Sequence, residues 1–261
     1  MYFNAPQTND HIYKKMYTRK KITFIIRLLE KDFGVPLRNR DDFTVNPLDM
    51  LIATLLSQNT NDINSHRAWK SLKEKFPDYK SLYNARTTSI ESAIRTGGMA
   101  RQKAARIKEL LRAVKKRYGK LSLEDIRQKS DEEIMEELTS LNGIGVKTAS
   151  CVILFGLGRN SFPVDTHVHR ILNRLGIVQT GNPEKTFYAM QELVPPDKMY
   201  SFHTNLIRFG RSICKAQRSE CYRCPLKKRC TYENKILQNT VSKLVNRGGP
   251  LKRDFMLLDN V

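Results

Sequence analysis

A lysine and an aspartate are the residues of this sequence best suited to act together in a reaction. Lys147 follows the two glycines of LNGIGVKTA, and Asp165 lies 18 residues later, in PVDTHVHR. A lysine in the first turn of a helix and partly buried is disfavoured in its protonated form, so its amine becomes a usable nucleophile. A carboxylate facing such an amine can stabilise a developing positive charge and transfer protons. Each residue alone also has a simpler role, phosphate contact for the lysine and helix capping for the aspartate.

The glycines before Lys147 predict a tight turn between two helices. Gly143 and Gly145 supply the backbone freedom that such a turn needs, and Leu141 and Ile144 are expected to fill the space between the helices. The turn presents free N–H groups and the positive end of the second helix, which together bind anions such as DNA phosphate. The residues expected at this anion site are Gly143, Gly145, Val146 and Thr148.

Four cysteines near the carboxyl end have the spacing C-x6-C-x2-C-x5-C and could close around one metal centre. They are Cys214, Cys221, Cys224 and Cys230. The uneven spacing suits a [4Fe–4S] cluster, whereas zinc sites more often use two separated CxxC pairs or include histidine. The fifth cysteine, Cys151, lies in an apolar helical segment and is expected to be a buried core thiol.

The charge of the chain indicates a polyanionic partner. The 261 residues include 46 Lys and Arg against 26 Asp and Glu, which gives a net charge of +20. A field of that sign attracts nucleic acid. The sequence contains no apolar run long enough for a transmembrane helix and no visible signal peptide, so we expect a reducing compartment and no membrane association.

The elements that must position these residues are predicted to be helices throughout. Apolar spacing predicts a helix over 18–34, a buried helix from Pro47 to about Ser57, and an amphipathic helix up to residue 76. Further helices are expected between residue 81 and the glycines at 97–98, over RQKAARIKELLRAVKKRYG, over 130–141, and in three segments between Asp165 and Cys214. No strand alternation is apparent, so the fold class is all-α. The polar segments 1–16 and 236–261 are interpreted as tails.

Together these motifs resemble the endonuclease III family of DNA glycosylases, within the helix-hairpin-helix superfamily. The resemblance rests on LNGIGVKTA, PVDTHVHR, the cysteine run and PLDMLIATLLSQNTND, and it covers roughly residues 18 to 234. It implies two helical domains with a cleft between them. The first holds residues 40–159 and the hairpin. The second combines residues 1–39 with 160–261 and holds the cluster, with the tails 1–16 and 236–261 uncertain.

The resemblance also implies an activity and a substrate. The nucleophilic lysine of the family corresponds to Lys147 and its catalytic aspartate to Asp165. Such an enzyme removes oxidised pyrimidines from duplex DNA, forms a Schiff base with the sugar, and nicks the strand by β-elimination. The implied cofactor is a [4Fe–4S] cluster on the four cysteines. The implied partner is double-stranded DNA with damaged bases or abasic sites, bound by a monomer.

Other positions of the family pattern correspond less cleanly. The residue that fills the space left by an extruded base corresponds to Asn59, where the family usually has glutamine, with Gln58 as the alternative register. The apolar wedge corresponds to Met99, and a tyrosine common after it is replaced by Ala100. Two further residues, His167 and Arg170, match the segment after the aspartate, where packing and phosphate contact are both expected roles. Asp62 matches an aspartate of the family motif, and helix capping is the alternative role for it.

Two other functions are consistent with the same motifs. A mismatch glycosylase that removes adenine or thymine shares the hairpin, aspartate and cluster, but usually lacks the lysine found at Lys147. A non-catalytic DNA-binding iron–sulfur protein would need neither member of the lysine–aspartate pair. The expected location is the cytoplasm or nucleoid in a prokaryote and the nucleus in a eukaryote.

Overall fold

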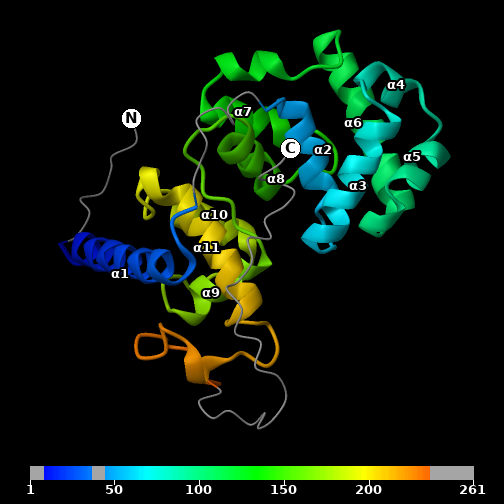
Figure 1. Cartoon of the computed structure of the whole chain (residues 1–261). Helices are drawn as coiled ribbons and strands as arrows, with labels where there is room; N and C mark the ends of the chain where they lie inside the picture. The colour runs from blue at the N-terminus through cyan, green and yellow to red at the C-terminus, as the bar shows by residue number, and fades with distance from the viewer. Residues whose placement is uncertain (1–8, 37–44, 236–261) are drawn as a thin grey trace, which may run out of the picture. The chain divides into compact units, whose positions relative to one another are not determined.

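The structure is a computed structural model that describes residues 9–36 and 45–235. Over these residues the regular structure is entirely helical, with no β-strand (Figure 1). The all-α class predicted from the hydrophobic spacing is therefore confirmed. The chain divides into two units, and within residues 45–235 the division falls between Pro163 and Val164. The tail predicted at 236–261 and the first part of the tail at 1–16 lie outside the described residues.

The unit ending at Pro163, here called the hairpin unit, consists of short helices around a buried central one. The central helix α2 (Pro47–Leu56) is buried along almost its entire length. It packs against α3, α6 and α8. The elements are α2, α3 (Asp62–Lys75), α4 (Tyr79–Asn84), α5 (Thr87–Ala93), η2 (Arg95–Gly97), α6 (Ala100–Tyr118), η3 (Glu124–Gln128), α7 (Asp131–Thr139), α8 (Val146–Cys151) and the π-helical segment η4 (Val152–Gly156).

Local capping signals explain where these helices begin. The Asn46 side chain accepts a hydrogen bond from the Leu48 amide, and Pro47 occupies the first helical position, where its missing N–H costs nothing. Ser130 and Glu133 form a reciprocal capping box at the start of α7. At the end of α6, Gly119 adopts the left-handed conformation that terminates many helices. These contacts are local in sequence, so the helix positions could be predicted without tertiary information.

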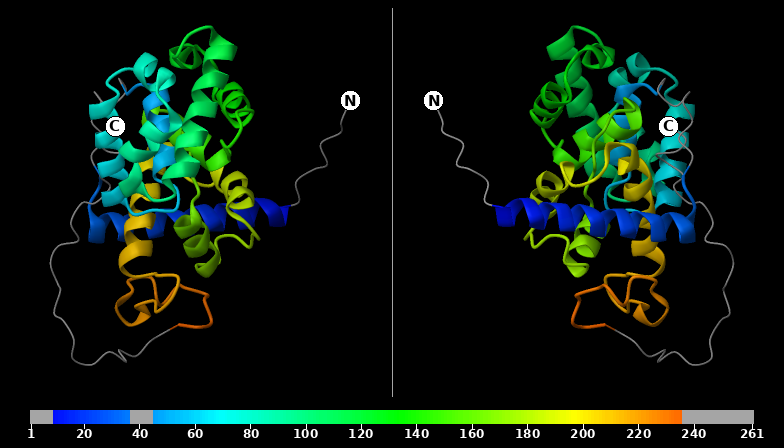
Figure 2. Two further views of the ribbon diagram at one scale, coloured as in Figure 1. Left: turned by 90° about the vertical axis from the view of Figure 1, so that its right-hand side faces the viewer. Right: turned by 90° about the vertical axis from the view of Figure 1, so that its left-hand side faces the viewer.

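The second unit, here called the cysteine unit, is built on α11 (Met199–Ser212). This helix packs against α1 (Asn9–Phe33) and α9 (Thr166–Arg174), and α9 also contacts α10 (Pro183–Gln191). Two short 3-10 segments, η5 (Pro196–Lys198) and η6 (Cys221–Arg223), complete the unit. The loop with the four cysteines continues from the carboxyl end of α11 in each view (Figures 1 and 2).

The first helix begins earlier than the sequence predicted. Residues 9–16, read as part of a polar tail, form the first turns of α1. Lys15 forms an ion pair with Glu192, and Arg19 donates a hydrogen bond to the Glu192 carbonyl oxygen at 2.7 Å. The segment lacks an apolar stripe, so its docking beside α10 has no signature in the local sequence.

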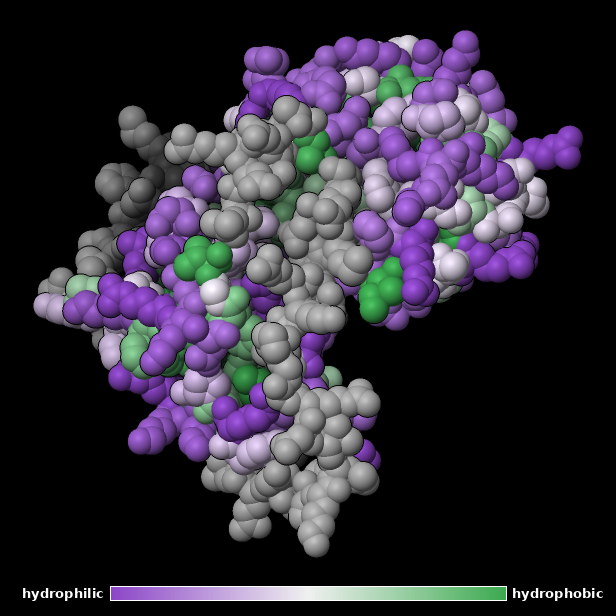
Figure 3. Space-filling view, in the orientation of Figure 1, coloured by the Kyte–Doolittle hydropathy of each residue, from purple (hydrophilic) through white to green (hydrophobic). Residues whose placement is uncertain are grey.

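Hydrophilic residues cover most of the described surface visible in Figure 3, and the hydrophobic patches on it are small and separated. None of the described helices is long and apolar enough to cross a membrane.

Candidate functional site

The predicted hairpin is present in the hairpin unit as α7, a tight turn and α8. Gly143 has φ +80°, a left-handed conformation that side chains rarely adopt. Gly145 precedes α8 in an extended conformation and offers no side-chain cap. Leu141 and Ile144 are buried between the helices, 4% and 5% exposed. The turn therefore leaves the first amides of α8 without a capping side chain.

These amides lie where the sequence predicts an anion site. The first N–H groups of a helix lack intrahelical partners, so Val146 and Lys147 present theirs at the positive end of α8. Thr148 differs from the other residues expected here, because it is buried and its amide donates to the Gly145 carbonyl at 2.9 Å. Thr148 therefore stabilises the first turn of α8, and its amide is not available to an anion.

The two glycines are expected to respond differently to alanine. At Gly143 the positive φ makes a side chain unfavourable, so Gly143→Ala should lower the free energy of unfolding by about 1–2 kcal/mol. At Gly145, φ is −98° and an added Cβ meets nothing within 4 Å. Gly145→Ala should leave stability unchanged and weaken DNA binding, because the methyl group would stand where a phosphate approaches the amides. Urea unfolding and fluorescence anisotropy with a duplex measure the two effects. An unchanged affinity for Gly145→Ala would contradict the anion site.

Lys147 is the second residue of α8 and is half-buried. Its side chain therefore starts at the positive end of a helix. This is the position for which the sequence predicts a nucleophilic amine.

Asp165 is the N-cap of α9, in the cysteine unit. Its Oδ1 accepts a hydrogen bond from the Val168 amide at 2.8 Å, and the residue is half-buried. The capping role is thus present. It occupies one carboxylate oxygen, and the other has no hydrogen-bond partner among the described residues. Capping and charge stabilisation are therefore compatible in one side chain.

His167 and Arg170 pack between α9 and α11. The Arg170 guanidinium donates to the Cys214 carbonyl at 2.7 Å and to the Gly210 carbonyl at 3.2 Å. It also contacts His167 Nδ1 at 3.1 Å. Burial lowers the pKa of His167 below its ordinary value, which favours a neutral imidazole at neutral pH. Of the two roles expected from sequence, the contacts support packing for both residues.

The structure brings together two predicted residues that lie far apart in sequence, on two loops that we call the loop pair (residues 57–61 and 98–99). The Asn59 Nδ2 atom lies 3.7 Å from the Met99 sulfur. Both residues have positive φ angles, 52° and 51°, which are uncommon outside glycine. Met99 is 46% exposed although apolar, and Asn59 is exposed too. An exposed apolar side chain and an exposed amide that lie side by side can enter a base stack together.

Arg106 is a candidate residue that sequence reasoning missed. Its Nη1 donates to Gln58 Oε1 at 3.3 Å, and its Cδ lies 4.0 Å from where a Gly143 Cβ would be. It therefore links the loop pair to the hairpin turn. The sequence predicts the helix that contains it, α6, but no local signal distinguishes Arg106 from the other cations of that helix. Because Gln58 is held by Arg106 and Asn59 contacts Met99, the contacts favour Asn59 as the residue that acts with Met99.

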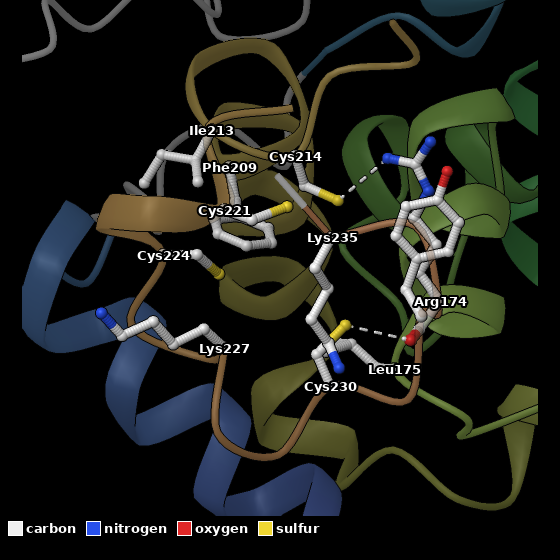
Figure 4. A pocket seen from close by; sticks show the side chains of 11 residues that line it. Arg174, Leu175, Phe209, Ile213, Cys214, Cys221, Cys224, Lys227, Cys230 and Lys235 are labelled. Carbon is white, nitrogen blue, oxygen red and sulfur yellow. Dashed lines mark hydrogen bonds between the residues drawn. The ribbon is translucent and has the colours of Figure 1, made fainter. Parts of the chain in front are cut away.

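The four predicted metal ligands line one pocket of the cysteine unit (Figure 4). The sulfur atoms of Cys214, Cys221, Cys224 and Cys230 surround a common space walled by Leu175, Phe209 and Ile213. Arg174 holds two sides of the pocket, because its Nη1 lies 3.5 Å from Cys214 Sγ and its carbonyl oxygen accepts from Cys230 Sγ at 3.2 Å. In the described residues, no three His, Cys, Asp or Glu side chains converge as a site for a single metal ion.

Burial favours the protonated form of two of these thiols, Cys214 and Cys224. It raises the pKa of Cys214, and it raises the pKa of Cys224 to about 11. A metal centre that binds thiolates must therefore release protons when it is loaded. The fifth cysteine, Cys151, is fully buried in α8, as predicted.

Comparison with known proteins identifies relatives for most of the chain. A family model described as the HhH-GPD superfamily of base excision DNA repair proteins matches residues 52–196. Endonuclease III of Thermotoga maritima is 38% identical over 193 residues, which cover 74% of this chain and 86% of that protein. A relative from Arabidopsis thaliana is 44% identical over 168 residues, 64% of this chain, and the match spans only 57% of the plant protein.

The structure is also similar to solved structures. A non-covalent complex of endonuclease III with DNA matches with a TM-score of 0.68 and 28% identity, over 82% of this chain and 95% of that one. A second structure with the same coverage and score is described as a trapped covalent intermediate of endonuclease III with DNA.

Proposed function

Because this chain belongs to the endonuclease III family of the HhH-GPD superfamily of base excision DNA repair glycosylases, we propose that it is a bifunctional enzyme for oxidised pyrimidines. It removes the damaged base from duplex DNA and then nicks the strand at the resulting abasic site. The observation that carries the proposal is Lys147 in the first turn of α8, directly after the glycine turn of the hairpin. A glycosylase that only hydrolyses the bond between base and sugar needs no amine at this position.

The reaction starts with the side-chain nitrogen of Lys147. This nitrogen attacks C1′ of the extruded nucleotide, the bond from C1′ to the base breaks, and the base leaves with the bonding electrons and takes up a proton. Opening of the sugar ring gives an imine between C1′ and the lysine nitrogen. Loss of a 2′ proton then expels the 3′ phosphate, which is the β-elimination that nicks the strand.

Asp165 supports the first step. Its carboxylate stabilises the positive charge that develops on the sugar and accepts a proton from the attacking amine. The contact with the Val168 amide fixes the orientation of the carboxylate through Oδ1. The proposal is supported by the second oxygen of this carboxylate, which has no hydrogen-bond partner among the described residues.

The hairpin binds the DNA backbone, and the loop pair inserts into the base stack. The amides of Val146 and Lys147 bind a phosphate, and this contact fixes register without reading sequence. Asn59 and Met99 enter the duplex, where the apolar side chain separates stacked bases and the amide occupies the space left by the extruded base.

The cysteine pocket is proposed to hold a [4Fe–4S] cluster. Cys214, Cys221, Cys224 and Cys230 are the ligands, and their lining of one pocket supports this assignment. When bound, the cluster cross-links the loop between Cys214 and Cys230 and supplies no atom to the reaction. Arg174 holds the same loop through the Lys215 carbonyl at 2.7 Å and the Ser219 hydroxyl at 2.9 Å.

The cluster assignment predicts a spectral change that depends on which cysteine is replaced. Cys221→Ser should remove most of the visible iron–sulfur absorbance of the purified protein, because a cluster with three thiolates is easily lost. Cys151→Ala is the matched control, since Cys151 is buried in α8 and does not line the pocket, and it should keep full absorbance. A colourless wild-type protein with one bound zinc ion would overturn the assignment.

Borohydride trapping on a duplex with a single thymine glycol tests the activity itself. The full chain is expected to give a covalent protein–DNA band, because reduction converts the imine into a stable amine. Trapping on an abasic duplex but not on the thymine glycol duplex would support the lyase activity and contradict the proposed substrate class. No trapping on either duplex would contradict the Schiff base and favour a mismatch glycosylase that only hydrolyses the bond between base and sugar.

A further inference from the structure

Lys103 is a buried lysine whose partners among residues 9–36 and 45–235 are carbonyl oxygens and no carboxylate. It lies on α6, is 3% exposed, and donates through Nζ to the Leu56 and Gly97 carbonyl oxygens, each at 2.8 Å. Burial lowers the pKa of Lys103 to about 8. Desolvating an amine is costly, so these two hydrogen bonds must compensate for the lost water.

The two carbonyl groups end two different helices. Leu56 is the last residue of α2, and Gly97 is the last residue of η2. Terminal carbonyls lack intrahelical donors and carry the negative end of the helix dipole, so a cation there is favourable. One side chain from a third helix therefore caps both ends and fixes the distance between them.

Beyond each carbonyl, the chain turns directly into the loop pair. Asn59 follows Leu56 and Met99 follows Gly97 within a few residues, and both adopt left-handed backbone conformations. Such conformations persist only where the surrounding structure holds them. An added Cβ at Gly97, directly before this loop, would lie 3.0 Å from the Ala68 Cβ of α3 and 3.9 Å from Lys103 Nζ, so Gly97 is packed closely against both.

We propose that Lys103 is a positioning residue that holds Asn59 and Met99 together as one element for entering DNA at a damaged base. The proposal rests on the proposed function, because it assigns a base-extruding role to the loop pair. Lys103 touches neither DNA nor the reacting atoms. It acts by tying the end of α2 to the end of η2.

Two activities of the same enzyme should depend on Lys103 to different extents. Removal of an intact damaged base requires the base to leave the stack, and the loop pair assists that step. An abasic site has no base to extrude, so cleavage there depends far less on the loop pair. Lys103 should therefore affect base removal more than abasic-site cleavage.

The chain provides a matched control on the same helix. Lys108 is also buried, 8% exposed, and its Nζ donates to the carbonyl oxygens of Tyr83 and Ala85, the latter at 2.9 Å. These carbonyls lie at the end of α4 and not beside the loop pair. Lys108→Met removes a buried amine with two carbonyl acceptors, so it reproduces the loss of stability without loosening Asn59 and Met99.

The experiment compares Lys103→Met and Lys108→Met as full chains under single-turnover conditions. One duplex contains thymine glycol and the other a pre-formed abasic site. Lys103→Met is expected to slow base removal by about tenfold or more and abasic-site cleavage by no more than about threefold. Lys108→Met should change both rates by the same factor. If Lys103→Met does not fold, Lys103→Gln, which keeps an NH2 donor group on a shorter and uncharged side chain, makes the same comparison.

Hydrogen–deuterium exchange provides a readout that does not depend on activity. Lys103→Met should speed exchange in residues 57–61 and 97–99, whereas Lys108→Met should leave these segments unchanged. Equal slowing of both activities by Lys103→Met, or unchanged exchange in the two segments, would overturn the positioning role. A wild-type protein inactive on both duplexes would refute the proposed function, and faster exchange at the two segments in Lys103→Met would still support the positioning role of Lys103.

Discussion

Replacing Lys147 by glutamine is expected to abolish strand cleavage at an abasic site, with a loss on the order of a thousandfold or more. Glutamine has a similar length but no nucleophilic nitrogen, so no imine can form and borohydride gives no covalent band. The backbone amide of residue 147 and the glycine turn are unchanged, so the phosphate site at the start of α8 remains. Quenched-flow cleavage and trapping on the same duplex measure both effects.

Lys147→Arg separates charge from nucleophilicity. Arginine keeps the positive charge beside the DNA, but its guanidinium stays protonated and does not attack C1′. Both variants should be equally inactive, while affinity for a non-cleavable abasic analogue, followed by fluorescence anisotropy, should remain close to wild type for arginine. Residual cleavage at the wild-type rate in either variant would remove Lys147 from the mechanism and leave it a phosphate contact.

Asp165→Asn is expected to slow base removal by on the order of a hundredfold or more while leaving the melting temperature unchanged. Asparagine caps helices as well as aspartate does, so its side-chain oxygen can still accept from the Val168 amide. It carries no negative charge, so it can neither stabilise a cationic sugar nor take a proton from the amine. Single-turnover base release measured beside thermal unfolding distinguishes the two roles.

Two further variants serve as controls for Asp165→Asn. Asp78 caps α4 by the same contact, its Oδ1 accepting from the Ser81 amide at 2.7 Å, and Asp78→Asn should change neither rate nor stability. Asp165→Ala removes both cap and charge, so it should also lower the free energy of unfolding by about 1 kcal/mol. Base removal by Asp165→Asn at the wild-type rate would show that the residue is only a cap.

These variants also distinguish the proposed activity from the two alternatives. A mismatch glycosylase would lose base removal in Asp165→Asn but keep it in Lys147→Gln, because hydrolysis needs the carboxylate and not the amine. A DNA-binding protein without catalytic activity would be unaffected by either change in every assay except binding. The bifunctional mechanism alone requires the lysine for strand cleavage and trapping, and the aspartate for base removal.

The sequence by itself determined the features that depend on short stretches of chain. The glycine turn, Lys147 at the start of α8 and Asp165 at the start of α9 could all be predicted, because turn and capping signals act over a few residues. The all-helical class followed from apolar spacing for the same reason. Family membership could be inferred from these motifs and the cysteine spacing together.

The tertiary structure alone decided which distant residues meet. The contact between Asn59 and Met99, the burial of Lys103 under both loops and the position of Arg106 beside the hairpin turn depend on how α2, α3 and α6 pack. A lysine or arginine on a basic helix has the same local pattern whether it faces solvent or caps a buried helix end. The same holds for α1, whose first turns are fixed by Glu192 from a distant part of the chain. Such pairings arise from side-chain packing and from satisfying buried backbone groups, and neither leaves a local signal in the sequence.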